Sequence, residues 1–456
     1  MELFGANQRF ALNVYISLFD CMELEIIFIS FNALLSVVWL VLVGWSLFAC
    51  MAVTNSGEQL LLLRKKVFAG NCAIAIALGL SRFDFGIVAR LMQQADWITT
   101  TDIGELAGFN VAGYVIGCID HSRDRTPQGV YKILLLSLFL LIASLWLESI
   151  NWSFSVRLIF RFLNGWSAGH LVCGVPGLAL SGASKQQSRR YTSILVSGAG
   201  IGSLIGAFGI GWIAAESPSL AWVAISAFAT LLAVPVFWLL TVSWKTKAGK
   251  VVFPSQENAL HKKHQVRYQN FKLAGLASGY SLIGAGMVPV VLYGPLIATQ
   301  RLGAGPALSS DSFALFGIGS VVGCFVASVF PSRWSNRTML PLISLIGLLG
   351  SVMYLKADAL YLEMIAIFLV GSWAYMTVSL SYDRLGELLD ESQKRRWWAL
   401  ISSFLGGSYS AFALIFSRMA SISMQEVLTA GVVLMVCQLL MELLQRSGID
   451  FGRPEP

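Results

Sequence analysis

Residues 79–86 read Gly-Leu-Ser-Arg-Phe-Asp-Phe-Gly, and this stretch lies inside an otherwise apolar run from Val67 to Met92. The run is long enough to cross a bilayer as a helix, because one crossing needs about 20 apolar residues. A charge near the middle of a bilayer costs at least ~2.5–3.5 kcal/mol. We therefore expect Arg82 and Asp84 either to pair with other groups or to line a polar path.

The whole chain has the composition of a helical membrane protein. Of its 456 residues, 56% are hydrophobic and 12% are charged, whereas soluble domains carry about 25% charged residues. The apolar runs have the length of membrane helices, not that of the ~10-residue alternating strands of a membrane barrel. The sequence predicts an all-α polytopic membrane protein.

Nucleic acid, metal and disulfide chemistry are not expected. The net charge of +7 comes mainly from short loops between hydrophobic spans, so it does not indicate a nucleic-acid surface. The seven cysteines lie in or beside apolar spans and include no Cys-x-x-Cys pair. Free, buried thiols are the prediction, with no metal site and no cofactor.

The hydrophobic spans form one leading helix followed by two sets of six. They are predicted at 26–53, 67–92, 103–119, 131–149, 153–182, 192–214, 219–243, 271–299, 310–331, 338–355, 358–381, 398–419 and 424–444. The leading span is either a genuine extra helix or a consequence of a start codon placed too early, with Met51 the natural start. A cleaved signal peptide is not expected, because a basic n-region is missing and the apolar run is too long.

Basic residues predict the orientation. Alternate loops between the spans carry most of them, including Arg64, Lys65, Lys66, Arg123, Arg125, Lys185, Arg189, Arg190, Arg333, Arg337, Lys394, Arg395 and Arg396. Loops rich in Lys and Arg lie on the cytoplasmic side. The C-terminus is therefore predicted to be cytoplasmic.

A polar, basic segment divides the two sets of helices. We predict an N-terminal extension with one extra helix (1–64), a first six-helix bundle (65–243), a cytoplasmic linker (244–270), a second six-helix bundle (271–445) and a cytoplasmic tail (446–456). A weak repeat supports this division, because the second helix of each set carries a Gly-x-x-x-Gly-Cys pattern. The two copies are Gly113, Gly117, Cys118 and Gly319, Gly323, Cys324. Such glycines let helices approach closely in lipid, and matched copies are typical of parallel repeats.

Three motifs carry a family resemblance. They are Gly79-Leu-Ser-Arg82-Phe83 in the first helix, Asn110-Val-Ala-Gly113-Tyr114-Val-Ile-Gly117 in the second, and Arg161-Phe-Leu-Asn-Gly165 in the fourth. In these motifs the chain resembles the major facilitator superfamily, and within it the bacterial YbfB/YjiJ-type transporters. The resemblance implies a major facilitator fold, and it covers roughly residues 66–444 in layout. Asp84 departs from it, because the family usually has a small or apolar residue there. Ser81 also replaces the second glycine of the opening motif.

Arg82, Asp84 and Arg161 are predicted to share one depth in the membrane. At ~1.5 Å per residue, each lies roughly 12–15 Å below the outer boundary. Residues two apart on a helix point in different directions, so Arg82 and Asp84 cannot share one face. We expect Arg82 to face a central cavity and Asp84 to pair with Arg161 or with another helix. The alternative is a fixed salt bridge without a role in transport.

Substrate and proton sites follow from these charges. Two arginines against one carboxylate favour an anionic solute, which guanidinium groups bind through paired hydrogen bonds. The predicted substrate-binding residues are Arg82, Tyr114, Arg161, Tyr280 and Tyr293. Proton coupling needs a group whose pKa changes with its surroundings, and Asp84 is the first candidate. His170 is the second, although a lone buried histidine is more often a packing residue.

The glycine-dense fifth helix resembles the superfamily's fifth helix, so Gly202 and Gly206 join Gly113, Gly117, Gly319 and Gly323 as predicted packing glycines. The sequence favours a secondary active transporter of a small, anionic organic solute, working by alternating access with proton coupling. The alternative is a non-transporting receptor, scaffold or assembly factor that keeps the fold. No nucleotide-binding loop or hydrolase motif is apparent, so an ATP-driven pump or an enzyme is not expected. The expected setting is the bacterial inner membrane, with lipid and solute as the partners of a monomer.

Overall fold

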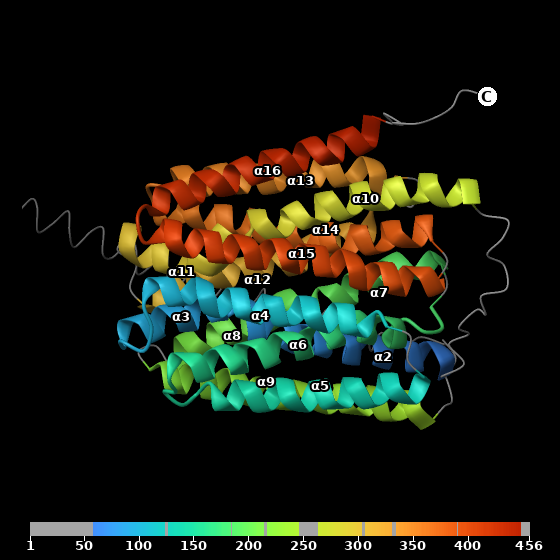
Figure 1. Cartoon of the computed structure of the whole chain (residues 1–456), viewed down its shortest axis with the longest axis horizontal. Helices are drawn as coiled ribbons and strands as arrows, with labels where there is room; N and C mark the ends of the chain where they lie inside the picture. Colours follow the sequence, from blue (N-terminus) through green and yellow to red (C-terminus); the bar gives the residue numbers. More distant parts are fainter. Residues whose placement is uncertain are drawn as a thin grey trace, which may run out of the picture. The chain divides into compact units, whose positions relative to one another are not determined.

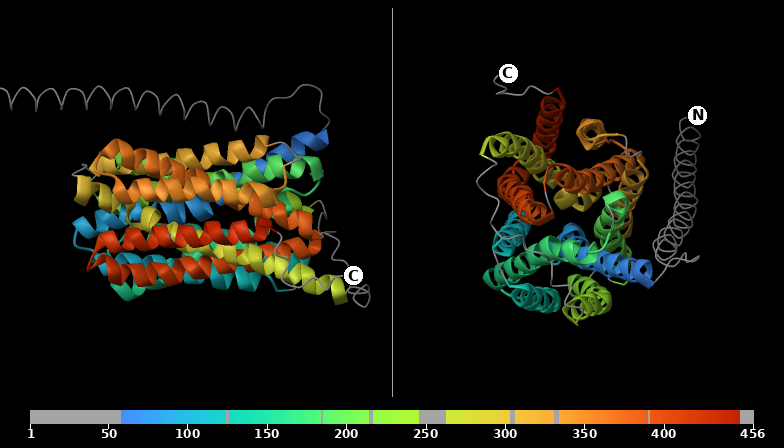
Figure 2. Two further views of the ribbon diagram at one scale, coloured as in Figure 1. Left: turned by 90° about the horizontal axis from the view of Figure 1, so that it is seen from above. Right: turned by 90° about the vertical axis from the view of Figure 1, so that its right-hand side faces the viewer.

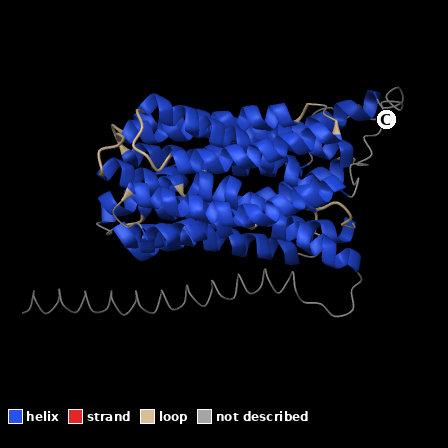
Figure 3. Cartoon of the chain, turned by 90° about the horizontal axis from the view of Figure 1, so that it is seen from below, coloured by secondary structure: helices blue, strands red, loops and turns tan. Residues whose placement is uncertain are grey.

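The computed structural model describes residues 58–123, 126–183, 185–213, 217–245, 263–302, 306–330, 334–389 and 391–447. Every regular element in this part of the chain is a helix (Figure 3). The chain divides into the units Met1–Leu61 and Leu62–Pro456, and all that follows concerns the second. The leading span predicted at 26–53 lies outside the described residues, as does the tail after residue 447.

All twelve spans predicted after the leading one are helical, and three of them are interrupted (Figure 1). The first span consists of α2 (Glu58–Ile74), the π-helix η1 (Ala75–Phe83) and α3 (Phe85–Gln94). The fifth consists of α7 (Lys185–Val196) and α8 (Gly198–Ile213), and the seventh of α10 (Lys263–Gly286) and α11 (Val288–Leu302). The uninterrupted helices are α4 (Thr100–His121), α5 (Pro127–Leu147), α6 (Phe154–Ala179), α9 (Pro218–Lys245), α12 (Pro306–Val329), α13 (Asn336–Lys356), α14 (Leu360–Leu388), α15 (Glu391–Ala420) and α16 (Met424–Ser447).

Nine of the described helical stretches are long and apolar enough to cross a membrane. Helices α4 and α6 are not among them, because both carry several charged and amide side chains, and the apolar part of α12, Phe313–Val329, is shorter. Helix α10 begins at Lys263, within the predicted linker 244–270. Among the described cysteines, which form no disulfide, Cys72, Cys118, Cys173 and Cys324 are buried as predicted, whereas Cys437 is exposed.

The two Gly-x-x-x-Gly motifs make equivalent contacts. A Cβ atom on Gly113 would lie 2.1 Å from the Phe162 carbonyl oxygen of α6, and one on Gly319 would lie 2.2 Å from the Phe368 carbonyl oxygen of α14. One turn later, a Cβ atom on Gly117 would lie 2.2 Å from a carbonyl oxygen of α6, and one on Gly323 would lie 2.3 Å from a carbonyl oxygen of α14. The neighbouring thiols of Cys118 and Cys324 each lie 3.8 Å from a carbonyl oxygen of the same partner helix. The predicted packing role of these four glycines follows from this geometry.

The repeat extends to whole helices. Helix α4 packs on α6 as α12 packs on α14, and α5 packs on α6 and α9 as α13 packs on α14 and α16. We call α2–α9 the first set and α10–α16 the second set. Equivalent packing in both sets supports the interpretation of the sequence as two parallel repeats.

Two seams join the sets, whose helices run side by side (Figure 2). In the first seam α4 contacts α15, and Ser410 donates a hydrogen bond of 2.7 Å to the Gly108 carbonyl oxygen. In the second seam α8 contacts α12, where a Cβ on Gly200 would lie 2.7 Å from the Gly317 carbonyl oxygen. The glycines of both seams therefore let the two sets approach closely.

Two glycines of α6 provide a matched test of the packing. A Cβ at residue 165 would lie 1.6 Å from the Asn110 carbonyl oxygen, whereas one at residue 177 would meet nothing within 4 Å. We expect Gly165→Ala to lower the unfolding free energy by about 1–3 kcal/mol through overpacking. Gly177→Ala should be neutral or slightly stabilising, because alanine favours a helix over glycine. Thermal unfolding of the purified protein in detergent measures both, and equal shifts would contradict the proposed packing.

Candidate functional site

The first membrane helix changes its helical type at the charged residues. Over η1 the backbone bonds span five residues, as in the 3.2 Å bond from the Asp84 amide to the Gly79 carbonyl oxygen, and α-helical bonding resumes in α3. Segments of π-helix are rare and frequently mark functional sites. Gly79 allows η1 to approach α8 closely, because a Cβ there would lie 2.6 Å from the Gly202 Cα. Arg82 and Asp84 lie where this change of helical type occurs, and they contact different neighbours.

Arg82 lies among aromatic rings of both sets. Its guanidinium carbon is 4.3 Å from the centre of the Tyr409 ring on α15 and 5.5 Å from that of Tyr114 on α4. The side chain is 6% exposed, and its Nε and Nη2 atoms have no hydrogen-bond partner among the described residues. Cation–π contacts and a side-chain hydrogen bond with Tyr409 stabilise the charge and leave Nε and Nη2 unused. One edge of a buried guanidinium is therefore free to bind an acceptor.

Four tyrosines from four helices surround this charge. Tyr114 on α4, Tyr280 on α10, Tyr375 on α14 and Tyr409 on α15 all lie within electrostatic range of Arg82. We call Arg82 and these tyrosines the central cluster. Tyr293 on α11 is buried within electrostatic range of Tyr409. The structure thus brings three predicted substrate residues, Arg82, Tyr114 and Tyr280, into one cluster, with Tyr293 next to it.

Arg161 lies at the predicted depth but has a different partner. Its Nη1 donates a 3.1 Å hydrogen bond to the Ser81 carbonyl oxygen, and its guanidinium stacks 4.1 Å from the centre of the Phe85 ring. The carboxylate within electrostatic range of it is that of Glu148, which follows α5. Of the two partners predicted for Asp84, Arg161 or another helix, the structure shows the second, because Ser203 of α8 donates a hydrogen bond to Asp84. The rise along a helix gives the height of a residue but does not identify its partner helix.

Glu148 is a buried acid that the sequence analysis missed. It closes the predicted span 131–149, where a carboxylate is usually solvated, yet it is 1% exposed. Its Oε2 atom lies 3.7 Å from the Arg157 Nη1 atom on α6. The sequence did contain a pattern that indicates such an acid. Arg157 and Arg161 lie one turn apart on α6, and two buried arginines need an acid nearby. With Glu148 near both, Arg82 is left as the cation of the central cluster.

Asp84 faces α8, away from the central cluster. It is fully buried, and its Oδ1 accepts a 3.3 Å hydrogen bond from the Ser203 hydroxyl, while Oδ2 has no partner among the described residues. A Cβ on Gly206 would lie 1.6 Å from this Oδ2. Only glycine leaves room for the carboxylate there. The prediction that Arg82 and Asp84 point in different directions is confirmed.

His170 belongs to a separate cluster at the end of α4. Its Nε2 lies 3.2 Å from the Asp120 Oδ2 atom, and its Nδ1 lies 3.4 Å from that of His121. The ring also meets that of Trp166 edge-to-face, with 4.5 Å between the ring centres. The structure therefore does not bring His170 together with Asp84, the other residue predicted for proton coupling.

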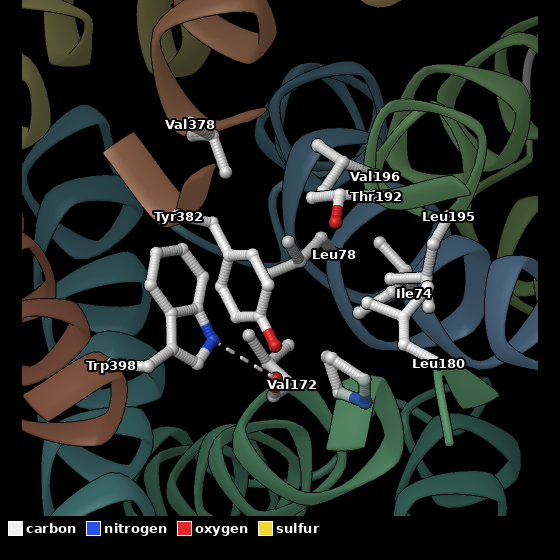
Figure 4. A pocket seen from close by; sticks show the side chains of 11 residues that line it. Ile74, Leu78, Val172, Leu180, Thr192, Leu195, Val196, Val378, Tyr382 and Trp398 are labelled. Carbon is white, nitrogen blue, oxygen red and sulfur yellow. Dashed lines mark hydrogen bonds between the residues drawn. The ribbon is translucent and has the colours of Figure 1, made fainter. Parts of the chain in front are cut away.

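A pocket opens between the two sets beside the central cluster (Figure 4). Leu78, one turn before Arg82, lines it together with Val172, Thr192, Tyr382 and Trp398. Trp398 of α15 closes one side by donating a 3.4 Å hydrogen bond to the Val172 carbonyl oxygen of α6. The lining is mainly apolar and comes from both sets, as a solute path between them requires.

A comparison with protein-family models identifies the family. The family model described as "Uncharacterised MFS-type transporter YbfB" matches residues 74–442. The match covers both sets of helices and includes η1, the central cluster and both Gly-x-x-x-Gly motifs. No curated protein matches the chain.

The contact between Asp84 and Gly206 can be tested by a double-mutant cycle. Gly206→Ala should destabilise the protein by about 1–3 kcal/mol, because the new methyl group overlaps the carboxylate. In an Asp84→Ala background the same change should cost less, with a coupling of about 0.5–3 kcal/mol. Gly407→Ala, where a Cβ would meet nothing within 4 Å, is the control. Additive effects of Gly206→Ala and Asp84→Ala on thermal unfolding would contradict the assigned contact.

Proposed function

The chain belongs to the YbfB family of MFS-type transporters, and from this membership we propose that it moves a small anionic organic solute by secondary active transport. Transport is the activity of the family, which points away from an enzyme. The nature of the solute and the coupling to protons are our inferences from the residues of the central cluster and of η1.

The free edge of Arg82 carries the proposal of an anionic solute. Nε and Nη2 are parallel donors, and a carboxylate accepts two such bonds in one plane. Both atoms are buried and lack a partner among the described residues. Leaving a charged group without hydrogen bonds in the interior is costly. An anion that binds this edge regains that free energy, which favours its capture over that of a neutral solute.

The position of Arg82 supports alternating access. Its guanidinium contacts the ring of Tyr114 in the first set and the ring of Tyr409 in the second. These two tyrosines lie on α4 and α15, the helices that form the first seam. A solute bound to Arg82 would therefore touch both sets at once. Tilting of the sets along the two glycine-lined seams would open the cluster first to one side of the membrane and then to the other.

Asp84 is our proposed proton carrier. The carboxylate is fully buried and receives one long hydrogen bond, from Ser203. A buried charge without a counter-ion is costly, and a proton removes the charge. Asp84 and Arg82 lie on different faces of one π-helical turn, so protonation at α8 and solute binding at the central cluster can both act on η1. Direct competition between solute and Asp84 for one arginine is not required.

The membrane orientation completes the proposal. Because the loops rich in Lys and Arg lie on the cytoplasmic side of membrane proteins, the C-terminus is assigned to the cytoplasm of a bacterial cell and the protein to its inner membrane. We further propose that it acts as a monomer, with lipid and solute as its partners and without nucleic acid.

Flux into proteoliposomes tests the two charges separately. The full-length protein is supplied with radiolabelled acetate, lactate, succinate and benzoate, with and without a pH gradient. Arg82→Ala should lower flux at least about tenfold, because hydrogen bonds to charged groups contribute about 1.5–3 kcal/mol. Asp84→Asn should retain flux down a solute gradient but lose its acceleration by the pH gradient.

The controls are Arg396→Ala and Asp358→Asn, whose side chains are exposed. Both should transport as the unmodified protein does. Unchanged flux in the Arg82 and Asp84 variants would refute the site assignment. The absence of flux for every organic anion would favour a receptor or scaffold.

A further inference from the structure

Phenylalanine side chains pack beside the four tyrosines of the central cluster. The Phe83 ring centre lies 5.5 Å from that of Phe316 on α12 and 5.6 Å from that of Tyr375, which it meets edge-on. The Arg82 guanidinium stacks on Tyr409 from the other set. Aromatic rings that meet at these distances accept another planar ring by stacking or by edge contact.

The hydrogen-bonding groups near these walls are few and specific. The Tyr375 hydroxyl is buried and has no partner among the described residues, which leaves it free to donate. Nearby amides are already used, because Asn110 donates a 3.0 Å hydrogen bond to Asn164. A sugar or another solute with many hydroxyl groups would find too few partners here.

The free donors near the cluster fit one carboxylate. Arg161 is held by the Ser81 carbonyl oxygen and shares the acid Glu148 with Arg157. Arg82 offers a free pair of donors on one edge within the central cluster. A second carboxylate or a phosphate dianion would bring a further charge into the buried site without such a pair of donors to receive it.

We propose that the solute is an aromatic monocarboxylate, an inference that rests on the proposed function of the central cluster. The carboxylate binds the Nε–Nη2 edge of Arg82 and accepts a hydrogen bond from the Tyr375 hydroxyl. The ring of the solute packs among Phe83, Tyr114 and Tyr409. No bond is made or broken in this step, so the site selects for shape, charge and aromatic character only.

Ligand-induced thermal stabilisation of the purified full-length protein tests this inference, because a ligand that binds only the folded state raises the unfolding temperature. The probes are benzoate, cyclohexanecarboxylate (same charge, no aromatic ring), benzamide (same ring, no charge) and phthalate (a second carboxylate). Benzoate should bind about 2- to 10-fold more tightly than cyclohexanecarboxylate, the effect of aromatic contacts. Benzamide should bind at least about tenfold more weakly than benzoate, because it cannot make the charge-assisted hydrogen bonds. Phthalate should also bind at least about tenfold more weakly, because its second carboxylate would be buried.

Two variants assign the effect to the cluster. Tyr375→Phe keeps the ring and should weaken benzoate binding about tenfold, because it removes a hydrogen bond to a charged group. Arg82→Lys keeps the charge and should weaken binding further, because it removes the paired donors. The controls are Tyr361→Phe and Arg396→Lys, both exposed, and neither should change benzoate binding.

Each other outcome overturns the inference in a distinct way. Equal affinity for benzoate and cyclohexanecarboxylate would exclude aromatic selection but leave an organic anion as the solute. Equal or tighter binding of phthalate would exclude the single charge. No response to either monocarboxylate, combined with flux of succinate in proteoliposomes, would reject this inference and keep the proposed function. Preference for benzamide over benzoate would reject both.

Discussion

Arg82 keeps a positive charge in the interior of the helical unit, where its closest described contacts are tyrosine and phenylalanine rings. The rings and a side-chain hydrogen bond with Tyr409 leave the Nε and Nη2 donors of the guanidinium unused. This constraint organises the rest of the site. The tyrosines come from α4, α10, α14 and α15, so the charge is surrounded only when both sets of helices are present. Any change in the tilt of the sets alters the surroundings of Arg82 directly.

The first membrane helix presents its two charges to different neighbours. Arg82 and Asp84 are two residues apart, so their side chains point in different directions, the first to α15 and the second to α8, where η1 gives way to α3. The glycines of α8 make this arrangement fit, since Gly202 admits the backbone of η1 and Gly206 admits the carboxylate. Solute binding and protonation can thus be linked through a short stretch of backbone without any direct contact between the two charges.

Most of the fold could be predicted from the sequence because it depends on long apolar runs and on repeated glycine spacing. The twelve helices after the leading one, and the matched contacts of Gly113 and Gly319, follow from these patterns. The direction of a buried side chain does not. Depth matching placed Arg161 level with Arg82 and Asp84, and Arg161 does donate a hydrogen bond to the carbonyl oxygen of Ser81, the residue before Arg82. It could not reveal that Asp84 faces Ser203, and it gave no reason to bury Glu148 at the end of a span.

The central claim is that the free edge of Arg82 receives the carboxylate of the solute. An experimental structure of the full-length protein, determined by electron cryomicroscopy in the presence of benzoate, tests it most directly. We predict density for a planar ligand with two oxygen atoms within hydrogen-bond distance of Nε and Nη2 of Arg82, and with its ring beside Tyr409. Density that lies against α8 beside Asp84, or in the apolar pocket next to Trp398 without contact to Arg82, would contradict the account.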